Sequence, residues 1–322
     1  MQSKKEAAVK TKTVTSKKRK LTTSDWQLYS MCLIPVLLVF VFSYIPMFGI
    51  IIAFKNYKYN LGIFGSEWVG FDNFKFFFKS DVFVQLVRNT ILNNAFFIVC
   101  TIVAAVATGI AMYHINSRKF TKVYQTMLIS PYFMSWVVAA YMVYAILNPS
   151  YGYLNQLLGL FGVESIDWYS KPMAWPIILM ICSIWKGVGV DSVYYYATLM
   201  GVDTSLFEAA EIDGANRWQI IWNIILPCLV PIIVLLTILK IGGIFRADFG
   251  LFYTVTQDGA SGTLYETTNV IDTYIYRTFR SGARGSYGLS SAVGLLQSFV
   301  GIIMVCTTNA VAKKIDPDYG LF

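Results

Sequence analysis

Residues 208–227, Glu-Ala-Ala-Glu-Ile-Asp-Gly-Ala-Asn-Arg-Trp-Gln-Ile-Ile-Trp-Asn-Ile-Ile-Leu-Pro, decide the fold. This polar segment separates two long apolar runs, which indicates a loop between two membrane spans. Ser205 and Glu208 have the Ser-x-x-Glu spacing of a capping box, and Gly214 stands where a left-handed residue would end a helix. Pro227 lies at the start of the next apolar run. We therefore expect a short helix, a bend and a return into the bilayer, forming a surface for another protein.

The composition extends this interpretation to the whole chain. Hydrophobic residues make up 56% of the sequence and charged residues 14%, whereas soluble domains have about half and a quarter. The apolar residues form blocks long enough to cross a bilayer, which takes roughly 20 residues of helix. This block length argues against a soluble protein with a large core, and weak period-two alternation argues against a β-barrel. Backbone N–H and C=O groups in lipid must form hydrogen bonds with one another, so the apolar blocks are expected to be helices.

The predicted fold class is all-α, a polytopic membrane protein with about six transmembrane helices. We place the spans at residues 29–54, 89–113, 123–147, 173–200, 225–245 and 289–312. Residues 1–24 form a basic tail, expected to be disordered and cytoplasmic, and residues 25–322 form the transmembrane domain. A basic tail beside a first span fits the positive-inside rule and contact with lipid headgroups better than nucleic-acid binding. Six spans then place both termini and residues 201–227 in the cytoplasm.

The sequence has few groups suited to catalysis. It contains no Gly-x-x-x-x-Gly-Lys-Ser/Thr motif, so ATP hydrolysis by a P-loop is excluded. The single histidine, His114, lies at the end of the second predicted span, and the five cysteines are not spaced as metal ligands. We expect no catalytic residue, no metal and no cofactor bound by this chain, and therefore an energy source on another subunit.

The spacing in residues 208–227 resembles the signature of permease subunits of binding-protein-dependent ABC importers. That signature has Glu-Ala-Ala, three residues, Gly, nine residues, Ile, one residue and Leu-Pro. The matching residues are Glu208, Ala209, Ala210, Gly214, Ile224, Leu226 and Pro227. The resemblance implies the type I ABC importer permease fold, with residues 201–227 as the coupling loop that docks on an ATPase. Glu211, Asp213 and Arg217 complete the expected ATPase-coupling residues.

Residues 45–49, 53–57, 65–71, 248–253 and 270–277 resemble the complex-oligosaccharide permeases of Gram-positive bacteria, of the LplB and YteP type. In that group two permeases form a heterodimer above two copies of a shared ABC ATPase, which binds ATP and Mg²⁺. An extracellular, lipid-anchored sugar-binding protein delivers the oligosaccharide. The resemblance implies these partners, a bacterial cell membrane location and ATP-driven import by alternating access. The alternatives are a secondary transporter or channel for a polar solute, or a membrane enzyme.

Polar and aromatic side chains within or near the spans are candidates for the substrate route. A charge inside a bilayer is costly and usually faces a cavity or a partner. Aromatic faces and hydrogen-bonding groups suit sugars, although Trp and Tyr also gather at membrane interfaces. The candidates are Asn89, Asn93, Asn94, Tyr132, Trp136, Trp185, Lys186, Asp191, Tyr195, Lys240, Arg246 and Asp248. The embedded lysines and outer arginines suggest an acidic oligosaccharide carrying uronate units, such as a pectin fragment. Pairing with a partner permease is the alternative role for the lysines.

Overall fold

The computed structural model describes residues 23–115 and 117–315, which fall into two units that divide after Gly49. The first unit is one helical rod: α1 (Thr23–Val39), the π-helical η1 (Phe40–Tyr44) and the start of the 3-10 helix η2 (Ile45–Phe54). Helix starts at Thr23, so residues 23 and 24 belong to the rod and not to the predicted tail. Residues 1–22 lie outside the described residues.

The predicted all-α class is confirmed. Among the described residues, five helices are long and apolar enough to cross a membrane, or six if the bent pair of residues 118–133 and 136–147 is one span: Trp26–Phe54, Val82–Tyr113, Pro172–Leu199, Arg217–Gly242 and Ser286–Lys314. Within the described residues the strands are β1 (Lys55–Asn56) and β2 (Glu67–Trp68), an antiparallel pair with Lys55 opposite Trp68. The second unit, residues 50–322, carries four of the five spans.

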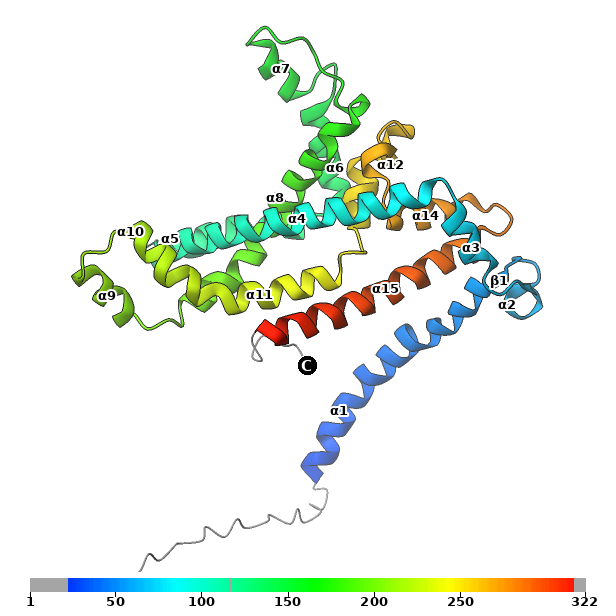
Figure 1. The fold of residues 1–322 in the computed structure, drawn as a ribbon, viewed down its shortest axis with the longest axis horizontal. Helices are drawn as coiled ribbons and strands as arrows, with labels where there is room; N and C mark the ends of the chain where they lie inside the picture. Colours follow the sequence, from blue (N-terminus) through cyan, green and yellow to red (C-terminus); the bar gives the residue numbers. More distant parts are fainter. Residues whose placement is uncertain (1–22, 116, 316–322) are drawn as a thin grey trace, which may run out of the picture. The chain divides into compact units, whose positions relative to one another are not determined.

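The elements of the second unit follow the chain in Figure 1. Those before the loop at residue 201 are α2 (Gly62–Gly65), α3 (Asp72–Lys79), α4 (Val82–Tyr113), α5 (Arg118–Ile129), η3 (Ser130–Phe133), α6 (Trp136–Leu147), α7 (Tyr153–Gly159), η4 (Trp168–Ser170), η5 (Pro172–Ala174) and α8 (Trp175–Leu199). Those after it are α9 (Ser205–Ile212), α10 (Arg217–Ile220), η6 (Ile221–Ile225), α11 (Leu226–Gly242), η7 (Gly250–Val255), α12 (Gln257–Ser261), α13 (Tyr265–Thr268), α14 (Ile271–Ser281) and α15 (Ser286–Ile315).

The third predicted span, residues 123–147, is not one straight helix. Residues 118–133 and α6 meet at an angle of 98°. Pro131 has no N–H for a continuing helix, and Met134 and Ser135 are extended. The Ser135 hydroxyl accepts the Val138 N–H and starts α6 afresh. The apolar block therefore continues in sequence across a point where the helix ends and a new helix begins.

The fifth predicted span starts earlier than residue 225. Helix runs without interruption from Arg217 to Gly242, so Pro227 lies inside it and not at its mouth. The π turn η6 precedes the proline, and the Leu226 N–H bonds to the Ile221 carbonyl five residues back. This wider turn accommodates the proline, which has no N–H of its own to donate.

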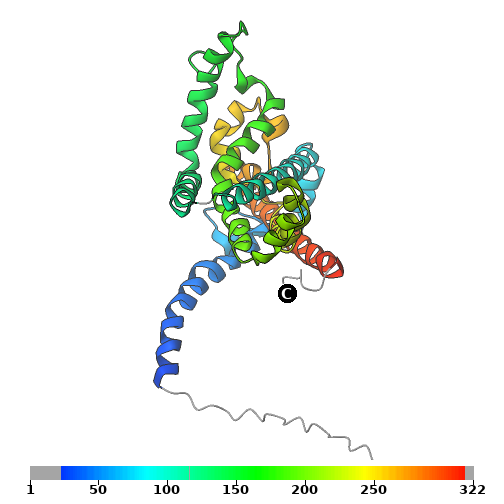
Figure 2. The same ribbon diagram turned by 90° about the vertical axis from the view of Figure 1, so that its left-hand side faces the viewer.

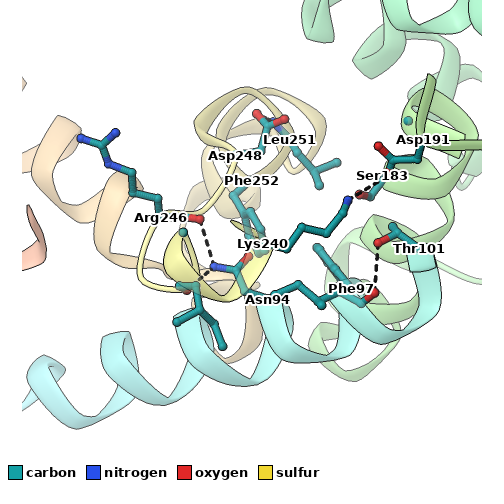
Figure 3. Close-up of a pocket in the computed structure, with 14 residues that line it drawn as sticks. Asn94, Phe97, Thr101, Ser183, Asp191, Lys240, Arg246, Asp248, Leu251 and Phe252 are labelled. Atoms are coloured by element: carbon teal, nitrogen blue, oxygen red, sulfur yellow. Dashed lines mark hydrogen bonds and ion pairs between the residues drawn. The ribbon is translucent and has the colours of Figure 1, made fainter. Parts of the chain in front are cut away.

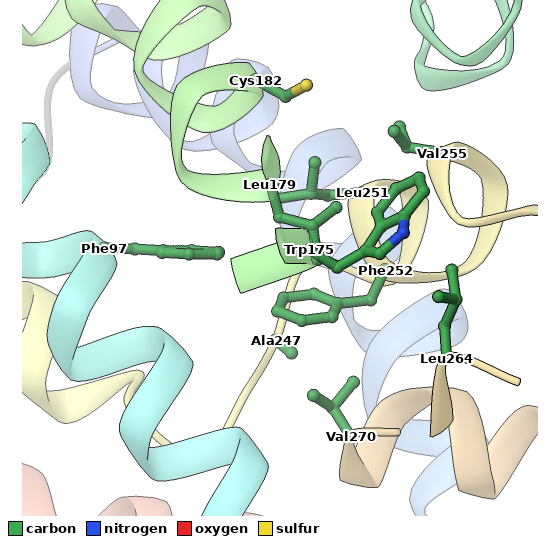
Figure 4. Close-up of a cluster of buried hydrophobic side chains, with 10 residues drawn as sticks. All are labelled: Phe97, Trp175, Leu179, Cys182, Ala247, Leu251, Phe252, Val255, Leu264 and Val270. Atoms are coloured by element: carbon green, nitrogen blue, oxygen red, sulfur yellow. The ribbon is translucent and has the colours of Figure 1, made fainter. Parts of the chain in front are cut away.

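Helix α4 packs along α8, and α11 packs against α15, as both views of the ribbon show (Figure 1, Figure 2). Glycines allow the closest crossings. A Cβ at Gly109 on α4 would lie 2.9 Å from the Tyr195 Cβ, and one at Gly189 on α8 would lie 2.0 Å from the Leu128 carbonyl oxygen. An apolar cluster around Trp175, Leu179 and Phe252 joins the start of α8 to η7 (Figure 4). These contacts fix the helices that line the candidate site.

Candidate functional site

The coupling loop, residues 201–227, contains the helical stop that its sequence predicts. Gly214 has φ +79°, in the left-handed region. Its N–H bonds to the Glu211 carbonyl at 3.1 Å, and the Ala215 N–H bonds to the Ala210 carbonyl at 2.9 Å. This pair of bonds is a Schellman motif, which satisfies carbonyls at the end of α9. An added Cβ would meet no atom within 4 Å, so a lack of space does not explain the glycine. Glycine is needed because other residues rarely adopt a positive φ.

The predicted capping box at Ser205 and Glu208 is wrong. Ser205 is already the first residue of α9, and its N–H donates to Asp203 Oδ1 at 3.0 Å. This hydrogen bond lowers the pKa of the Asp203 carboxyl, because it stabilises the ionised form. The capping box is instead in α10, where Asn216 Oδ1 accepts the Gln219 N–H and Gln219 Oε1 accepts the Asn216 N–H. Both ends of the bend are therefore fixed by local hydrogen bonds.

The signature residues divide between an anchored face and an exposed face. Ala210, Ile224 and Leu226 pack against the apolar cluster formed around Tyr195 and Ile225. The remaining ATPase-coupling residues predicted from sequence are exposed: Glu208, Ala209, Glu211, Asp213, Gly214, Arg217 and Pro227. The side chain of Ile212 beside them is 86% exposed. The loop thus presents a surface of acidic groups around an apolar tip, held on the spans by its other face.

A cavity of about 330 Å³ lies among α4, α8, α11 and η7 (Figure 3). Its lining residues are Asn94, Phe97, Ile98, Thr101, Ser183, Gly187, Asp191, Lys240, Gly243, Ile244, Arg246, Asp248, Leu251 and Phe252. The Lys240 Nζ lies 2.7 Å from Asp191 Oδ2, and the two side chains are 31% and 25% exposed. The cavity therefore holds an ion pair joining α11 to α8.

Other polar groups of the cavity are committed to its walls. Asn94 Nδ2 donates to the Ile244 carbonyl at 2.7 Å and the Arg246 carbonyl at 3.1 Å. Asp248 accepts the Trp136 Nε1–H at 2.7 Å and the Leu251 N–H at 3.2 Å. Figure 3 shows the guanidinium of Arg246 directed away from Lys240. Asn94, Asp191, Lys240, Arg246 and Asp248 are the predicted route residues that the structure brings together.

Asn89 and Asn93 do not line the cavity, contrary to the interpretation of the asparagine stripe on α4. Both are buried, at 5% and 6% exposure. The Asn89 amide donates to the carbonyls of Glu266 and Asn269 at 3.0 and 3.1 Å, and the Asn93 amide donates to the Thr267 carbonyl at 2.9 Å. They hold the segment after α12 against α4, because its backbone carbonyls would otherwise be buried without donors.

Lys186 is also placed differently from the sequence interpretation, since it is not among the cavity residues. Its Nζ donates to the carbonyls of Tyr132, at 2.9 Å, and Met134, and lies 5.2 Å from the centre of the Trp136 ring. These carbonyls are released where the backbone breaks between η3 and α6. Sequence reasoning missed this role because the break is invisible in the hydropathy.

The aromatic candidates are outside the cavity. Tyr195 is 1% exposed and packs in the core, whereas Tyr132 and Trp185 are 52% and 37% exposed. The cavity has its own aromatic pair, Phe97 and Phe252, stacked with ring centres 5.8 Å apart. Sequence reasoning missed these rings, together with Thr101 and Ser183. One available signal was the four-residue spacing of Ser183, Gly187 and Asp191, which places them on one face of α8.

The apolar spans and the enclosed ion pair define a multi-pass membrane protein with a polar cavity. This chain belongs to the family of binding-protein-dependent transport system inner membrane components, whose family model matches residues 82–317. The predicted class, an ABC importer permease, is confirmed.

Named relatives support the same class. LplB of Bacillus subtilis is 34% identical over 91% of this chain and 90% of its own length. The polygalacturonan/rhamnogalacturonan transport system permease YteP of the same organism is 33% identical over 89% of this chain and 88% of its own. A chain in the crystal structure of a bacterial ABC transporter that imports the acidic polysaccharide alginate has a TM-score of 0.81 and 32% identity. That match covers 91% of this chain and 97% of the other.

Proposed function

We propose that this chain is a permease subunit of an ATP-driven importer of acidic oligosaccharides that carry uronic acid units. The observation that carries the substrate class is the cavity between the spans, whose lining includes the Lys240 ammonium and the Asp191 carboxylate. An ammonium group suits a carboxylate, and both charged groups can hydrogen-bond sugar hydroxyls. The named substrates of YteP and of the alginate transporter are acidic polysaccharides, which supports the same class here.

The partners follow from what this chain would need in order to act. A second permease would complete the route as a heterodimer, and two copies of an ABC ATPase would bind ATP and Mg²⁺, since this sequence has no P-loop. An extracellular, lipid-anchored binding protein would deliver the sugar. A solved alginate transporter structure that contains a pentasaccharide-bound periplasmic protein supports such a delivery step, with a TM-score of 0.80 to this chain. Both termini and the coupling loop would then face the cytoplasm, with lipid around the spans.

The mechanism is alternating access driven through the coupling loop. ATP binding closes the ATPase dimer and moves the loop as a rigid body, because a Schellman motif and a capping box fix its bend. The loop joins the end of α8 to the start of the helix that contains α11. These two helices hold Asp191 and Lys240, so movement of the loop reaches the cavity through continuous helix.

The test is ATP hydrolysis by the reconstituted complex, with partner subunits and binding protein, in lipid vesicles. Oligogalacturonates are compared with carboxyl-reduced oligosaccharides of the same length. We expect stimulation by the acidic series and ATP-dependent uptake of the same sugars. Stimulation by the neutral series alone would overturn the acidic assignment. Uptake that proceeds without ATP would overturn the importer mechanism and favour a secondary transporter or a channel.

A further inference from the structure

The ion pair in the cavity is the starting point. Lys240 on α11 and Asp191 on α8 are 49 positions apart in sequence. Their Nζ and Oδ2 atoms lie 2.7 Å apart in the lining of the cavity. An isolated charge at this depth in the membrane is costly, and an opposite charge offsets much of that cost. The Asp191 carboxylate thus neutralises Lys240 while the cavity holds no substrate. An ammonium has three N–H donors, and a second carboxylate would satisfy it equally well.

The other charges of the cavity are less available. The Asp248 carboxylate accepts two hydrogen bonds from the wall, and the Arg246 guanidinium points away from Lys240 (Figure 3). Lys186 donates to backbone carbonyls outside the cavity lining. The pair of Lys240 and Asp191 is therefore the charged group best placed to contact a solute there.

We propose that a uronic acid unit inserts between Lys240 and Asp191, an inference that rests on the proposed function. The sugar carboxylate takes the place of the Asp191 carboxylate on Lys240, and a sugar hydroxyl donates to Asp191. Lys240 thus exchanges one carboxylate for another, and Asp191 receives a hydrogen bond from the sugar in place of its ion pair. A neutral sugar supplies the hydroxyl but leaves Lys240 without an anion, so the pair selects uronates over neutral sugars.

The surroundings of the pair fit this insertion. Gly187 and Ser183 lie about one and two turns before Asp191 on the same face of α8, and Gly187 has no side chain to fill the space. A Cβ added at Gly187 would meet no atom within 4 Å, so the cavity is open at that point. Phe97 and Phe252, which stack on each other and are 7% and 1% exposed, close the apolar part of the lining. The accessible part of the cavity therefore offers polar groups to a sugar.

The pair also connects substrate to the coupling loop. Insertion of a sugar separates the side chains that tie α8 to α11, and the coupling loop is the connection between those helices. Occupancy of the cavity thereby changes the restraint on the loop. This explains, in physical terms, how an acidic sugar would promote ATP hydrolysis by a subunit that it does not touch.

The experiment measures uptake of oligogalacturonate and of its carboxyl-reduced counterpart by the reconstituted complex. Lys240→Gln is expected to lower acidic uptake roughly tenfold or more, the usual effect of losing a hydrogen bond to a charged group. Lys240→Arg should retain most of it. Asp191→Asn keeps an acceptor for the sugar hydroxyl but loses the carboxylate, so it should lower acidic uptake less than Lys240→Gln does. Lys75→Gln, which breaks an exposed pair with Asp72 on α3, is the matched control and should change nothing.

The charge exchange Lys240→Asp with Asp191→Lys separates a structural pair from a substrate site. It preserves an ion pair between α8 and α11 but moves the cation to the other helix. We expect the exchanged complex to assemble normally and to lose acidic uptake. If the exchange restores uptake that both single variants lose equally, the pair is structural and the inference is wrong. Unchanged uptake in Lys240→Gln also overturns it, whereas an unresponsive wild-type complex instead overturns the proposed function.

Discussion

Replacement of Gly214 by alanine tests whether the left-handed stop of α9 orients the ATPase-docking surface. The backbone at Gly214 has φ +79°, and an added Cβ would meet no atom within 4 Å. The cost is therefore the backbone strain of an L-residue in this region, about 1–2 kcal/mol, without a steric term. At about 1.4 kcal/mol per tenfold, this cost shifts the equilibrium toward the form that lacks the Schellman hydrogen bonds by a factor of roughly 5 to 30.

The expected consequence is a loss of coupling without a loss of folding. Because the bend and not the core is affected, the Gly214→Ala complex should assemble normally, as judged by size-exclusion chromatography. Sugar uptake per ATP hydrolysed should fall several-fold, since the exposed acidic face of α9 is no longer held in one orientation. In Gly214→Asn the uptake per ATP should fall less, because asparagine tolerates the left-handed region better than alanine.

Gly201→Ala is the matched control within the same loop. Gly201 has no positive φ, and a Cβ there would lie 3.4 Å from the Thr198 carbonyl oxygen, an ordinary contact. It should transport like the wild type. Equal uptake per ATP in Gly214→Ala and the wild type would refute the reasoning that the backbone at this residue sets the docking geometry.

Three further predictions concern the packing of the spans, each checked by thermal unfolding of the purified complex. Asn89→Ala should destabilise it by about 1–3 kcal/mol, because buried carbonyls near α13 lose their donor. Gly189→Ala should cost a similar amount or more, since its Cβ would lie 2.0 Å from the Leu128 carbonyl oxygen; a normal melting temperature would contradict that crossing. Burial raises the pKa of the Asp272 carboxyl, so its contribution to stability falls as pH rises from about 4 through that raised pKa. Asp272→Asn keeps an acceptor oxygen and should remove this fall, whereas an unchanged pH profile would contradict the assignment.

The coupling loop shows how much of the site was available from sequence. The helical stop at Gly214 was predicted correctly because a helix stop is a local property, decided within a few residues. The misplaced capping box at Ser205 shows the limit of such reasoning, since Asp203 accepts the Ser205 N–H and the box forms at Asn216, before the next helix. Local patterns propose several caps, and only the folded backbone selects among them.

The cavity was only partly predictable. Lys240 and Asp191 were both named as route candidates from their charge within apolar spans, but their pairing was not foreseen. A helix that is apolar on most sides gives no periodic signal for the direction in which one polar residue points. Asn89 therefore looked the same in sequence as Asn94, although the first holds a distant loop and the second lines the cavity.

By itself the sequence determined that this protein consists of membrane helices and that the loop at residues 201–227 contains a helical stop, because block length and helix-stop residues are local features of the chain. The tertiary structure alone decided the 98° break before α6, the capture of Lys186 by the carbonyls freed there, and the meeting of α8 with α11 at the ion pair. Each of these depends on how helices rotate and cross. Close packing against distant segments sets that geometry, and no local pattern encodes it.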